Sequence, residues 1–158
     1  SLEVERRFLI KNNDWEKLIN RKSEIIQGYL SSNSEKWIVR IRSEDNSYKL
    51  TIKKHIIMAK NLEFEFDIPK IDGETIISQL KNLIIKERFY LIYSGKEWII
   101  DRFKDKNFPL EIAEVELKTI DEQINLPNFL STEITGLKKF SNFQLSSNPF
   151  SSWHKKTY

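Results

Sequence analysis

Apolar and polar residues alternate with a period of two along much of this 158-residue chain. That period places successive side chains on opposite faces of an extended strand, and the alternating runs are rich in Ile, Val, Phe, Tyr and Trp, which favour strands. Eight runs are therefore predicted to be strands: 3–10, 25–30, 36–43, 48–53, 61–68, 85–94, 97–104 and 112–118. About eight strands are enough for a closed barrel or for two packed sheets.

Three other segments have the pattern of helices. Residues 14–20 follow a cap at Asn13 or Asp14. In residues 72–83, apolar side chains recur every third or fourth position, which is the spacing of one helix face. Residues 126–130 are the third candidate, a short helix that contains a proline near its start. Strands with a few flanking helices make the predicted fold class α+β.

Charged residues of one sign occupy alternate positions of several predicted strands. In an ordinary antiparallel sheet such a face points to water. Like charges that are neighbours repel, however, so many doublets of one sign are costly unless something neutralises them. A closed barrel with the charged faces turned into its lumen is the alternative. The doublets and their neighbours are Glu3 and Glu5 with Arg7, Arg40 and Arg42, Lys49 and Lys53, Glu63 and Glu65, Lys86 and Arg88, and Glu114 and Glu116.

A charged lumen of this kind calls for two kinds of ligand. Clustered carboxylates cannot all stay ionised without a cation, and clustered Lys and Arg side chains require a multiply charged anion. The chain has no cysteine, so metal ligands must be oxygen or imidazole groups, which disfavours zinc and favours hard cations such as Mg²⁺. A metal-bound polyphosphate satisfies both walls at once.

Length and composition restrict the remaining possibilities. A chain of 158 residues with 4 glycines, 4 prolines and no linker is predicted to be one domain over residues 1–158. We expect no membrane span and no signal segment, and hence a cytoplasmic protein. The 26 basic and 23 acidic residues are interleaved, so no nucleic acid is expected as a partner. The two histidines, His55 and His154, are expected at the surface, because they lack metal-ligand spacing.

The ordered charge motifs resemble those of the CYTH family, the triphosphate tunnel metalloenzymes, and in particular its short bacterial inorganic triphosphatases. The likeness covers nearly the whole chain. One position departs from the family signature, since Arg7 stands where that signature has lysine. The motifs are Glu3-Val4-Glu5-Arg6-Arg7, Gln27-Gly28-Tyr29-Leu30, Val39-Arg40-Ile41-Arg42, Leu50-Thr51-Ile52-Lys53, Glu63-Phe64-Glu65, Asp101 after Trp98, Ala113-Glu114-Val115-Glu116-Leu117 and Ser141-Asn142.

The resemblance implies an eight-stranded antiparallel tunnel and assigns roles inside it. One or two Mg²⁺ or Mn²⁺ ions would bind the metal ligands Glu3, Glu5, Glu114 and Glu116. The acidic pair Glu63 and Glu65 would serve the metal or position basic side chains. The triphosphate would bind to Arg7, Arg40, Arg42, Lys53 and Arg88.

The resemblance also implies a catalytic role for Lys86, which would activate the attacking water. That role needs a lowered pKa, and crowding by Arg40, Arg42 and Arg88 would lower the pKa of Lys86, whereas nearby glutamates would raise it. A plain phosphate contact is the alternative for this lysine, because lysine often binds phosphate without acting as a base.

We expect metal-dependent hydrolysis of a triphosphate, with inorganic tripolyphosphate as the substrate because no adenine or thiamine motif is visible. A class IV-like adenylyl cyclase or a thiamine triphosphatase would use the same groups on a nucleoside or organic triphosphate. A non-catalytic polyphosphate- or nucleotide-binding barrel, and an interaction module with merely solvated charges, are further alternatives. Apolar outer strand faces allow a homodimer or a cover of helices. Residues 146–158 are either a tail or a helix that closes one tunnel mouth.

Overall fold

The computed structural model describes residues 1–31 and 37–154. Within them the chain forms nine strands, two α-helices and short 3-10 helices. The helical segments are η1 (Asp14–Leu18), α1 (Lys70–Ser78), η2 (Asp105–Asn107), η3 (Lys138–Phe140), α2 (Asn142–Ser147) and η4 (Phe150–Ser152). The strands are β1 (Leu2–Ile10), β2 (Ile19–Tyr29), β3 (Ile38–Glu44), β4 (Ser47–Ile57), β5 (Lys60–Ile68), β6 (Ile84–Tyr93), β7 (Lys96–Phe103), β8 (Glu111–Leu117) and β9 (Leu130–Glu133).

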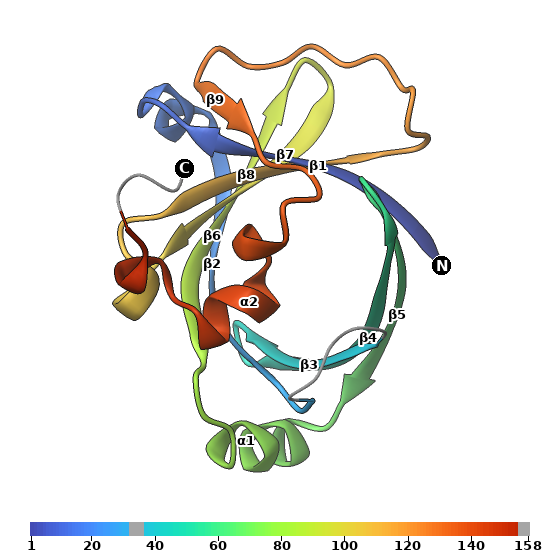
Figure 1. The fold of residues 1–158 in the computed structure, drawn as a ribbon, viewed down its shortest axis with the longest axis vertical. Coiled ribbons are helices and arrows are strands. Elements are labelled where there is room, and N and C mark those ends of the chain that lie inside the picture. The colour runs from blue at the N-terminus through green and yellow to red at the C-terminus, as the bar shows by residue number, and fades with distance from the viewer. Residues whose placement is uncertain (32–36, 155–158) are drawn as a thin grey trace.

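The strands form one antiparallel sheet in the order β5-β4-β3-β2-β6-β7-β8-β1-β9 (Figure 1). A further pairing of β5 with β1, with Leu2 opposite Leu62, closes eight of these strands into a barrel. The short strand β9 adds to β1 outside that ring. Closure removes the open sheet edges and separates an inner face from an outer one along every strand. The predicted eight-stranded antiparallel barrel and the α+β class are confirmed.

The larger apolar core lies on the outer face of the barrel. Trp15 of η1 is fully buried, and its ring centroid lies 5.1 Å from that of Phe89 on β6. Trp98 of β7 and Val115 of β8 belong to the same buried cluster. A second apolar cluster, which includes Leu145 of α2, forms where the C-terminal segment meets the strands. The apolar faces of the first cluster therefore pack outward. The second cluster fills one end of the lumen, because its Ile84 and Ile112 share strand faces with Lys86 and Glu114.

The predicted helix over 72–83 is shifted in the structure. α1 begins directly after Pro69, whose fixed φ suits a helix start, and it ends at Ser78. Asn82 then has a positive φ of 59°, which breaks helical geometry. Leu80 and Leu83 pack instead over Gly28 of β2, where any Cβ would lie 2.8 Å from each of their side chains. The apolar spacing of Leu80 and Leu83 thus reflects their packing against the barrel and not a continuation of the helix.

The prediction of a helix over 126–130 is wrong, because this stretch has turns and then β9. Its backbone bonds to other parts of the chain, as when the Lys11 N–H donates to the Phe129 carbonyl (2.9 Å). Residues 14–20 form a 3-10 helix only as far as Leu18, since β2 begins at Ile19. The predicted strand start at residue 36 lies outside the described residues.

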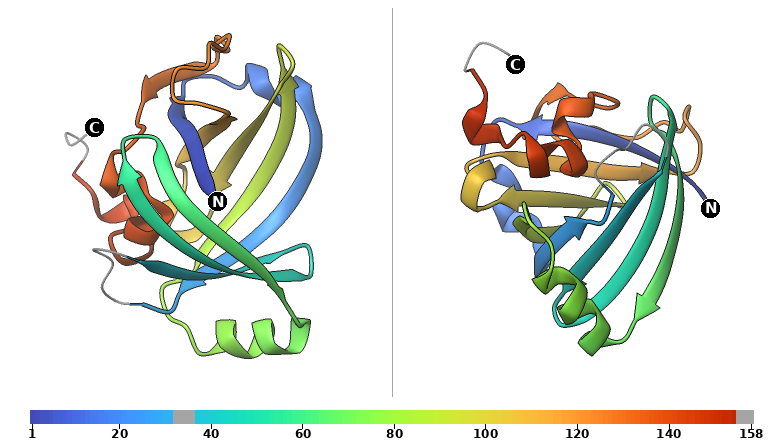
Figure 2. Two further views of the ribbon diagram at one scale, coloured as in Figure 1. Left: turned by 90° about the vertical axis from the view of Figure 1, so that its right-hand side faces the viewer. Right: turned by 60° about the horizontal axis from the view of Figure 1, so that its bottom comes forward.

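Helices cover different parts of the barrel (Figure 2). α1 lies outside β3 and β4, and Tyr48 of β4 packs so closely against Gly73 that a Cβ there would meet its ring at 2.3 Å. α2 lies across one end of the barrel against β2 and β6. Of the alternatives for residues 146–158, a cover over one end fits the described part, whereas 155–158 lie outside it. No helix in the described residues is both long and apolar enough to span a membrane.

Candidate active site in the barrel lumen

Strand register brings the predicted residues to one interior surface. Glu114 of β8 lies directly opposite Arg7 of β1, and Glu116 lies opposite Glu5. On the far wall, Lys53 of β4 lies directly opposite Glu63 of β5. The pairing of β1 with β8 joins strands that are distant in sequence, whereas β4 and β5 are consecutive strands. The charged doublets face one another across the lumen, which excludes the reading in which they only line a solvated outer face.

The four glutamates of β1 and β8 stand as two carboxyl pairs. A hydrogen bond between the Glu3 and Glu116 carboxyls lowers the pKa of Glu3 and raises the pKa of Glu116 to about 7. Burial, followed by the charge of Glu114, raises the pKa of Glu5 to about 7. In each pair one carboxyl group is harder to ionise than usual, and a nearby cation would offset this. In the described part of the chain, no three Asp, Glu or His side chains converge into a ready metal site.

Cations moderate the second pair. Arg7 Nε lies 3.3 Å from Glu114 Oε2, and Lys53 Nζ lies 3.7 Å from Glu5 Oε1. Burial alone would raise the pKa of Glu114, but Arg7 and, more weakly, Arg88 outweigh it and lower that pKa to about 2. Glu114 is thus an ionised carboxylate beside a guanidinium.

The basic wall centres on two arginines of β3. Arg40 Nη2 donates to Thr51 Oγ1 (3.0 Å) and lies 3.6 Å from both Glu63 Oε1 and Glu65 Oε2. The buried Arg40 Nε has no hydrogen-bond partner among the described residues. Glu63 and Glu65 therefore contact a basic side chain, which corresponds to the second of their two predicted roles.

Arg42 is held in place by a neutral partner. Its Nε donates to Gln27 Oε1 (2.8 Å), and Gln27 in turn donates to the Tyr29 hydroxyl (2.9 Å). Burial, reinforced by the charges of Arg40 and Arg88, lowers the pKa of Arg42 to about 9. An anion in the lumen would relieve this crowding of positive charge.

Lys86 and Arg88 share one carboxylate. Lys86 Nζ donates to Asp101 Oδ2 (2.7 Å), and Arg88 grips both oxygens of Asp101 with Nε (2.8 Å) and Nη2 (2.9 Å). The second partner of Lys86 is Asn142 of α2, whose Oδ1 accepts a hydrogen bond from Lys86 Nζ (2.9 Å). Lys86 has 0% exposed surface. Burial lowers its pKa well below the ordinary value, although Asp101 acts in the opposite direction.

From the sequence, Asp101 and Asn142 were recognisable only as parts of motifs, without a predicted role. For Asp101 a signal was present, since it is a carboxylate that ends the apolar run Trp98-Ile99-Ile100 and shares a strand face with Ile99. For Asn142 there was none, because its partner is 56 residues away.

A cavity of about 420 Å³ opens beside Arg42 and Arg88. Its rim contains Glu44, which accepts hydrogen bonds from the Ser23 hydroxyl (2.6 Å) and from the Tyr90 hydroxyl. The guanidinium of Arg21 lies 3.8 Å from the centroid of the Tyr90 ring. The two histidines are exposed, as predicted.

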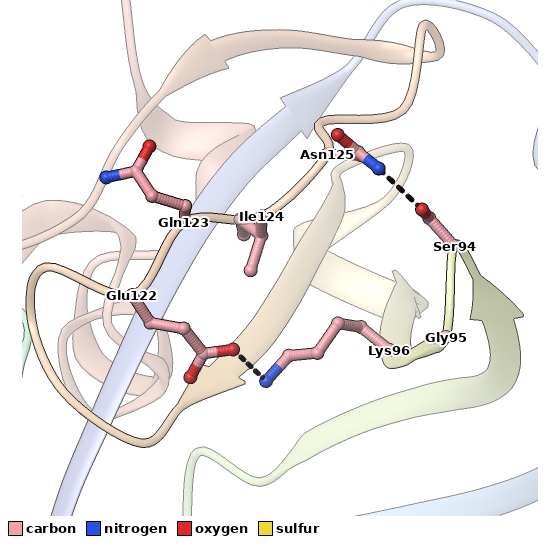
Figure 3. Close-up of a pocket in the computed structure, with 7 residues that line it drawn as sticks. All are labelled: Ser94, Gly95, Lys96, Glu122, Gln123, Ile124 and Asn125. Carbon is pink, nitrogen blue, oxygen red and sulfur yellow. Dashed lines mark hydrogen bonds and ion pairs between the residues drawn. The ribbon is translucent and has the colours of Figure 1, made fainter.

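A second cavity of about 370 Å³ lies away from the charged lumen residues (Figure 3). It forms where the connection from β8 to β9 crosses the turn between β6 and β7. Lys96 Nζ binds Glu122 Oε2 (2.7 Å), and Asn125 Nδ2 donates to Ser94 Oγ (2.6 Å). These two bonds tie the connection to the turn, and none of the predicted site residues lines this cavity.

A closed antiparallel barrel with opposed acidic and basic walls defines a tunnel protein built for a highly charged ligand. The comparisons agree with this class. The CYTH domain family matches residues 1–147, so the chain belongs to that family. An inorganic triphosphatase of Acetivibrio thermocellus is 30% identical over 151 residues, which are 94% of this chain and 95% of that protein.

Solved structures share the fold. The inorganic triphosphatase NE1496 has a TM-score of 0.68 and 24% identity, and the match covers 91% of this chain and 93% of that one. A putative adenylyl cyclase from Hippeastrum, which has a dominant triphosphatase activity, has a TM-score of 0.58 and 11% identity over 74% of this chain and 80% of its own. The predicted family is confirmed, and the chain is an enzyme of the triphosphatase type.

Proposed function

We propose that this protein hydrolyses inorganic tripolyphosphate with the help of a divalent metal ion. The observation that carries the proposal is the opposition of an acidic wall and a basic wall in one closed lumen. On β1 and β8 the pKa values of Glu5 and Glu116 are raised to about 7, and on β3 burial and neighbouring guanidiniums lower the pKa of Arg42 to about 9. A metal-bound polyphosphate relieves both.

The phosphate-binding residues in this proposal come from four strands. Arginine forks suit phosphate oxygens, and the buried Arg40 Nε is an unused donor within the described part of the chain. Asp101 holds one edge of the Arg88 guanidinium through Nε and Nη2, and Arg88 also lines the neighbouring cavity. Arg7 keeps the charge of the lysine that it replaces in the family signature, but it cannot lose a proton near neutral pH. The proposed set is Arg7, Arg40, Arg42, Lys53 and Arg88.

The proposed metal ligands are Glu3, Glu5, Glu114 and Glu116. Their oxygen donors fit Mg²⁺ or Mn²⁺, and the raised pKa values of Glu5 and Glu116 fit a place that a cation would stabilise. Mg²⁺ usually takes only one or two carboxylates, together with water and phosphate oxygens, so separate carboxyl pairs suffice for one or two ions. When bound, the metal neutralises charge that develops on the phosphate oxygens.

Lys86 is the proposed base. Water attacks the terminal phosphorus, the bond to the bridging oxygen breaks, and a water proton passes to the neutral amine of Lys86 while diphosphate leaves. The lowered pKa of Lys86 supports this role, because its burial favours the uncharged amine. Its present bonds to Asp101 and Asn142 also suit the alternative in which Lys86 only positions neighbouring groups.

The rim of the larger cavity favours an inorganic substrate over ATP or thiamine triphosphate. Tyr90 is the one aromatic residue in that lining, and Arg21 already covers its ring. A nucleobase or thiamine ring would therefore lack an open aromatic surface for stacking there. This observation weighs against the cyclase and the thiamine triphosphatase alternatives.

Phosphate release from tripolyphosphate, ATP and thiamine triphosphate, each with Mg²⁺ or Mn²⁺, tests the proposal. We expect fastest release from tripolyphosphate and a loss of at least ~100-fold in both Lys86→Ala and Glu116→Ala. Surface controls are Lys17→Ala and Glu74→Ala, both at exposed positions. Tight binding in calorimetry without release would instead establish the non-catalytic barrel.

Three further expectations stay predictions. Residues 1–158 are proposed to form one domain, and the proposed place of action is the cytoplasm. A homodimer through the outer face of β4 and β5 is supported by the exposed rings of Phe64 and Phe66. Analytical ultracentrifugation of the intact protein and of Phe66→Lys would test that interface.

A further inference from the structure

α2 contacts the buried lysine of the lumen through Asn142. The Asn142 carboxamide oxygen accepts a hydrogen bond from Lys86 Nζ (2.9 Å), on a lysine that also donates to Asp101 (2.7 Å). Because Lys86 is fully buried, bulk water does not replace either partner. The position and the hydrogen bonding of this amine therefore depend on a residue from outside the barrel.

The helix that carries this amide is firmly seated. Ser141 caps its first turn by accepting a hydrogen bond from the Gln144 N–H (3.1 Å). Leu145 is fully buried in the apolar cluster at that end of the barrel. The ring of Phe143 packs edge-on against Tyr29 of β2, with centroids 5.3 Å apart. These contacts fix the amide relative to the strands.

The amide is uncharged, and its surroundings make that property important. Asp101 of β7 raises the pKa of Lys86, whereas Arg88 of β6 and Arg42 of β3 lower it, in addition to burial. Glu114 of β8 also interacts electrostatically with Lys86. An amide satisfies a donor of the amine without adding negative charge, but a carboxylate in the same place would hold the ammonium form.

We propose that Asn142 is a positioning residue for Lys86, through which α2 fixes the amine beside the substrate phosphates and keeps it able to lose a proton. This inference rests on the proposed function, in which Lys86 takes a proton from the attacking water. Asn142 itself does not touch the reacting atoms. The end of the barrel and the chemistry inside it are thereby coupled through one hydrogen bond.

Two substitutions at this position separate placement from charge. In Asn142→Asp, the shape is kept and a carboxylate is added, so the midpoint of the rise in kcat with pH should move up by about one unit, with activity regained at alkaline pH. In Asn142→Ala, kcat should fall about 10-fold with little change in KM, because an interaction needed for the chemical step is lost. Ser147→Ala, at an exposed position on the same helix, is the matched control.

A second measurement does not depend on turnover. The ¹³Cε resonance of Lys86, assigned by its disappearance in Lys86→Arg, reports the titration of the amine directly. We expect that titration to move to higher pH in Asn142→Asp and to stay unchanged in Ser147→Ala. The same shift in the pH–rate profile and in the resonance would support the proposal.

Unchanged titration and an unchanged pH profile in Asn142→Asp would overturn it. A loss of kcat that only follows a fall in melting temperature, equal at every pH, would also overturn it, since it would show a merely structural contact. If the intact protein releases no phosphate, the proposed function fails, and the resonance alone decides whether Asn142 sets the state of Lys86.

Discussion

Two walls of the same lumen handle charge in opposite ways. On β6 and β7, Asp101 binds both Lys86 and Arg88 within 2.9 Å, and Asn142 completes the bonding of Lys86. On β1 and β8, carboxyl groups lie against one another, and one member of each pair has a pKa raised to about 7. The first arrangement is complete without a ligand, whereas the second gains stability from one. The comparison fits our proposal that the acidic wall binds the metal ion and that the Asp101 network positions Lys86 and Arg88.

The largest expected effect comes from removing the carboxylate that binds both Lys86 and Arg88. Replacing Asp101 with Ala leaves a buried lysine and a buried arginine without their carboxylate, and losing one partner of a buried ion pair costs about 3–5 kcal/mol. We expect urea unfolding to show a loss of that size in Asp101→Ala. As a control, Asp67→Ala removes a partner of the half-exposed Lys49 and should change stability by less than ~1 kcal/mol.

The next effect concerns the wall of β3. Arg40→Ala should weaken tripolyphosphate binding in the presence of Mg²⁺ by about 10- to 100-fold, because a charge-assisted contact with phosphate is lost. Arg40→Lys should recover only part of the affinity, since lysine lacks the fork of donors. Isothermal titration calorimetry measures both. Equal affinity in all three proteins would contradict the assignment of Arg40 to the phosphate site.

Addition of a divalent metal ion should stabilise the folded protein through the carboxyl pairs of β1 and β8, and not through the Asp101 network. A cation at 100 times its Kd adds about 2.7 kcal/mol to folding stability, so Mg²⁺ should raise the melting temperature of the intact protein by several degrees. Glu116→Ala should remove most of that rise, whereas Glu74→Ala on α1 should keep it. The rise should also disappear when EDTA is added in excess. A similar rise in Glu116→Ala would place the metal elsewhere.

The smallest effect is a change of stability with acid. Burial would raise the pKa of Asp101, but Arg88 and Lys86 outweigh it and hold that pKa far below 3.8. The folded-state pKa is lowered, so the stability from Asp101 is fully present above pH 3.8 and is lost as pH falls toward the folded value. Asp101→Asn lacks this dependence. We therefore expect the stability difference between the two proteins to narrow below about pH 4 in acid titrations.

The barrel was predictable because its signal is local. Alternation within a strand depends only on neighbouring residues, so Arg40 and Arg42, or Glu114 and Glu116, could be assigned to one face before any contact was known. The prediction of a helix over 126–130 was wrong for the opposite reason, because the structure of this stretch depends on distant contacts. The Phe129 carbonyl in this stretch accepts a hydrogen bond from the Lys11 N–H, and that partner lies far away in the sequence.

The sequence by itself determined which side chains share a charged face, because the two-residue period of a strand is a property of the backbone. Only the tertiary structure decided which charges meet. Closing β1 onto β5 and β8 gives the glutamates of β1 and β8 one another as neighbours, and seating α2 on the barrel end gives Lys86 a neutral partner. Those pairings decide the pKa values, because electrostatic interactions depend on distance and burial, which no local pattern contains.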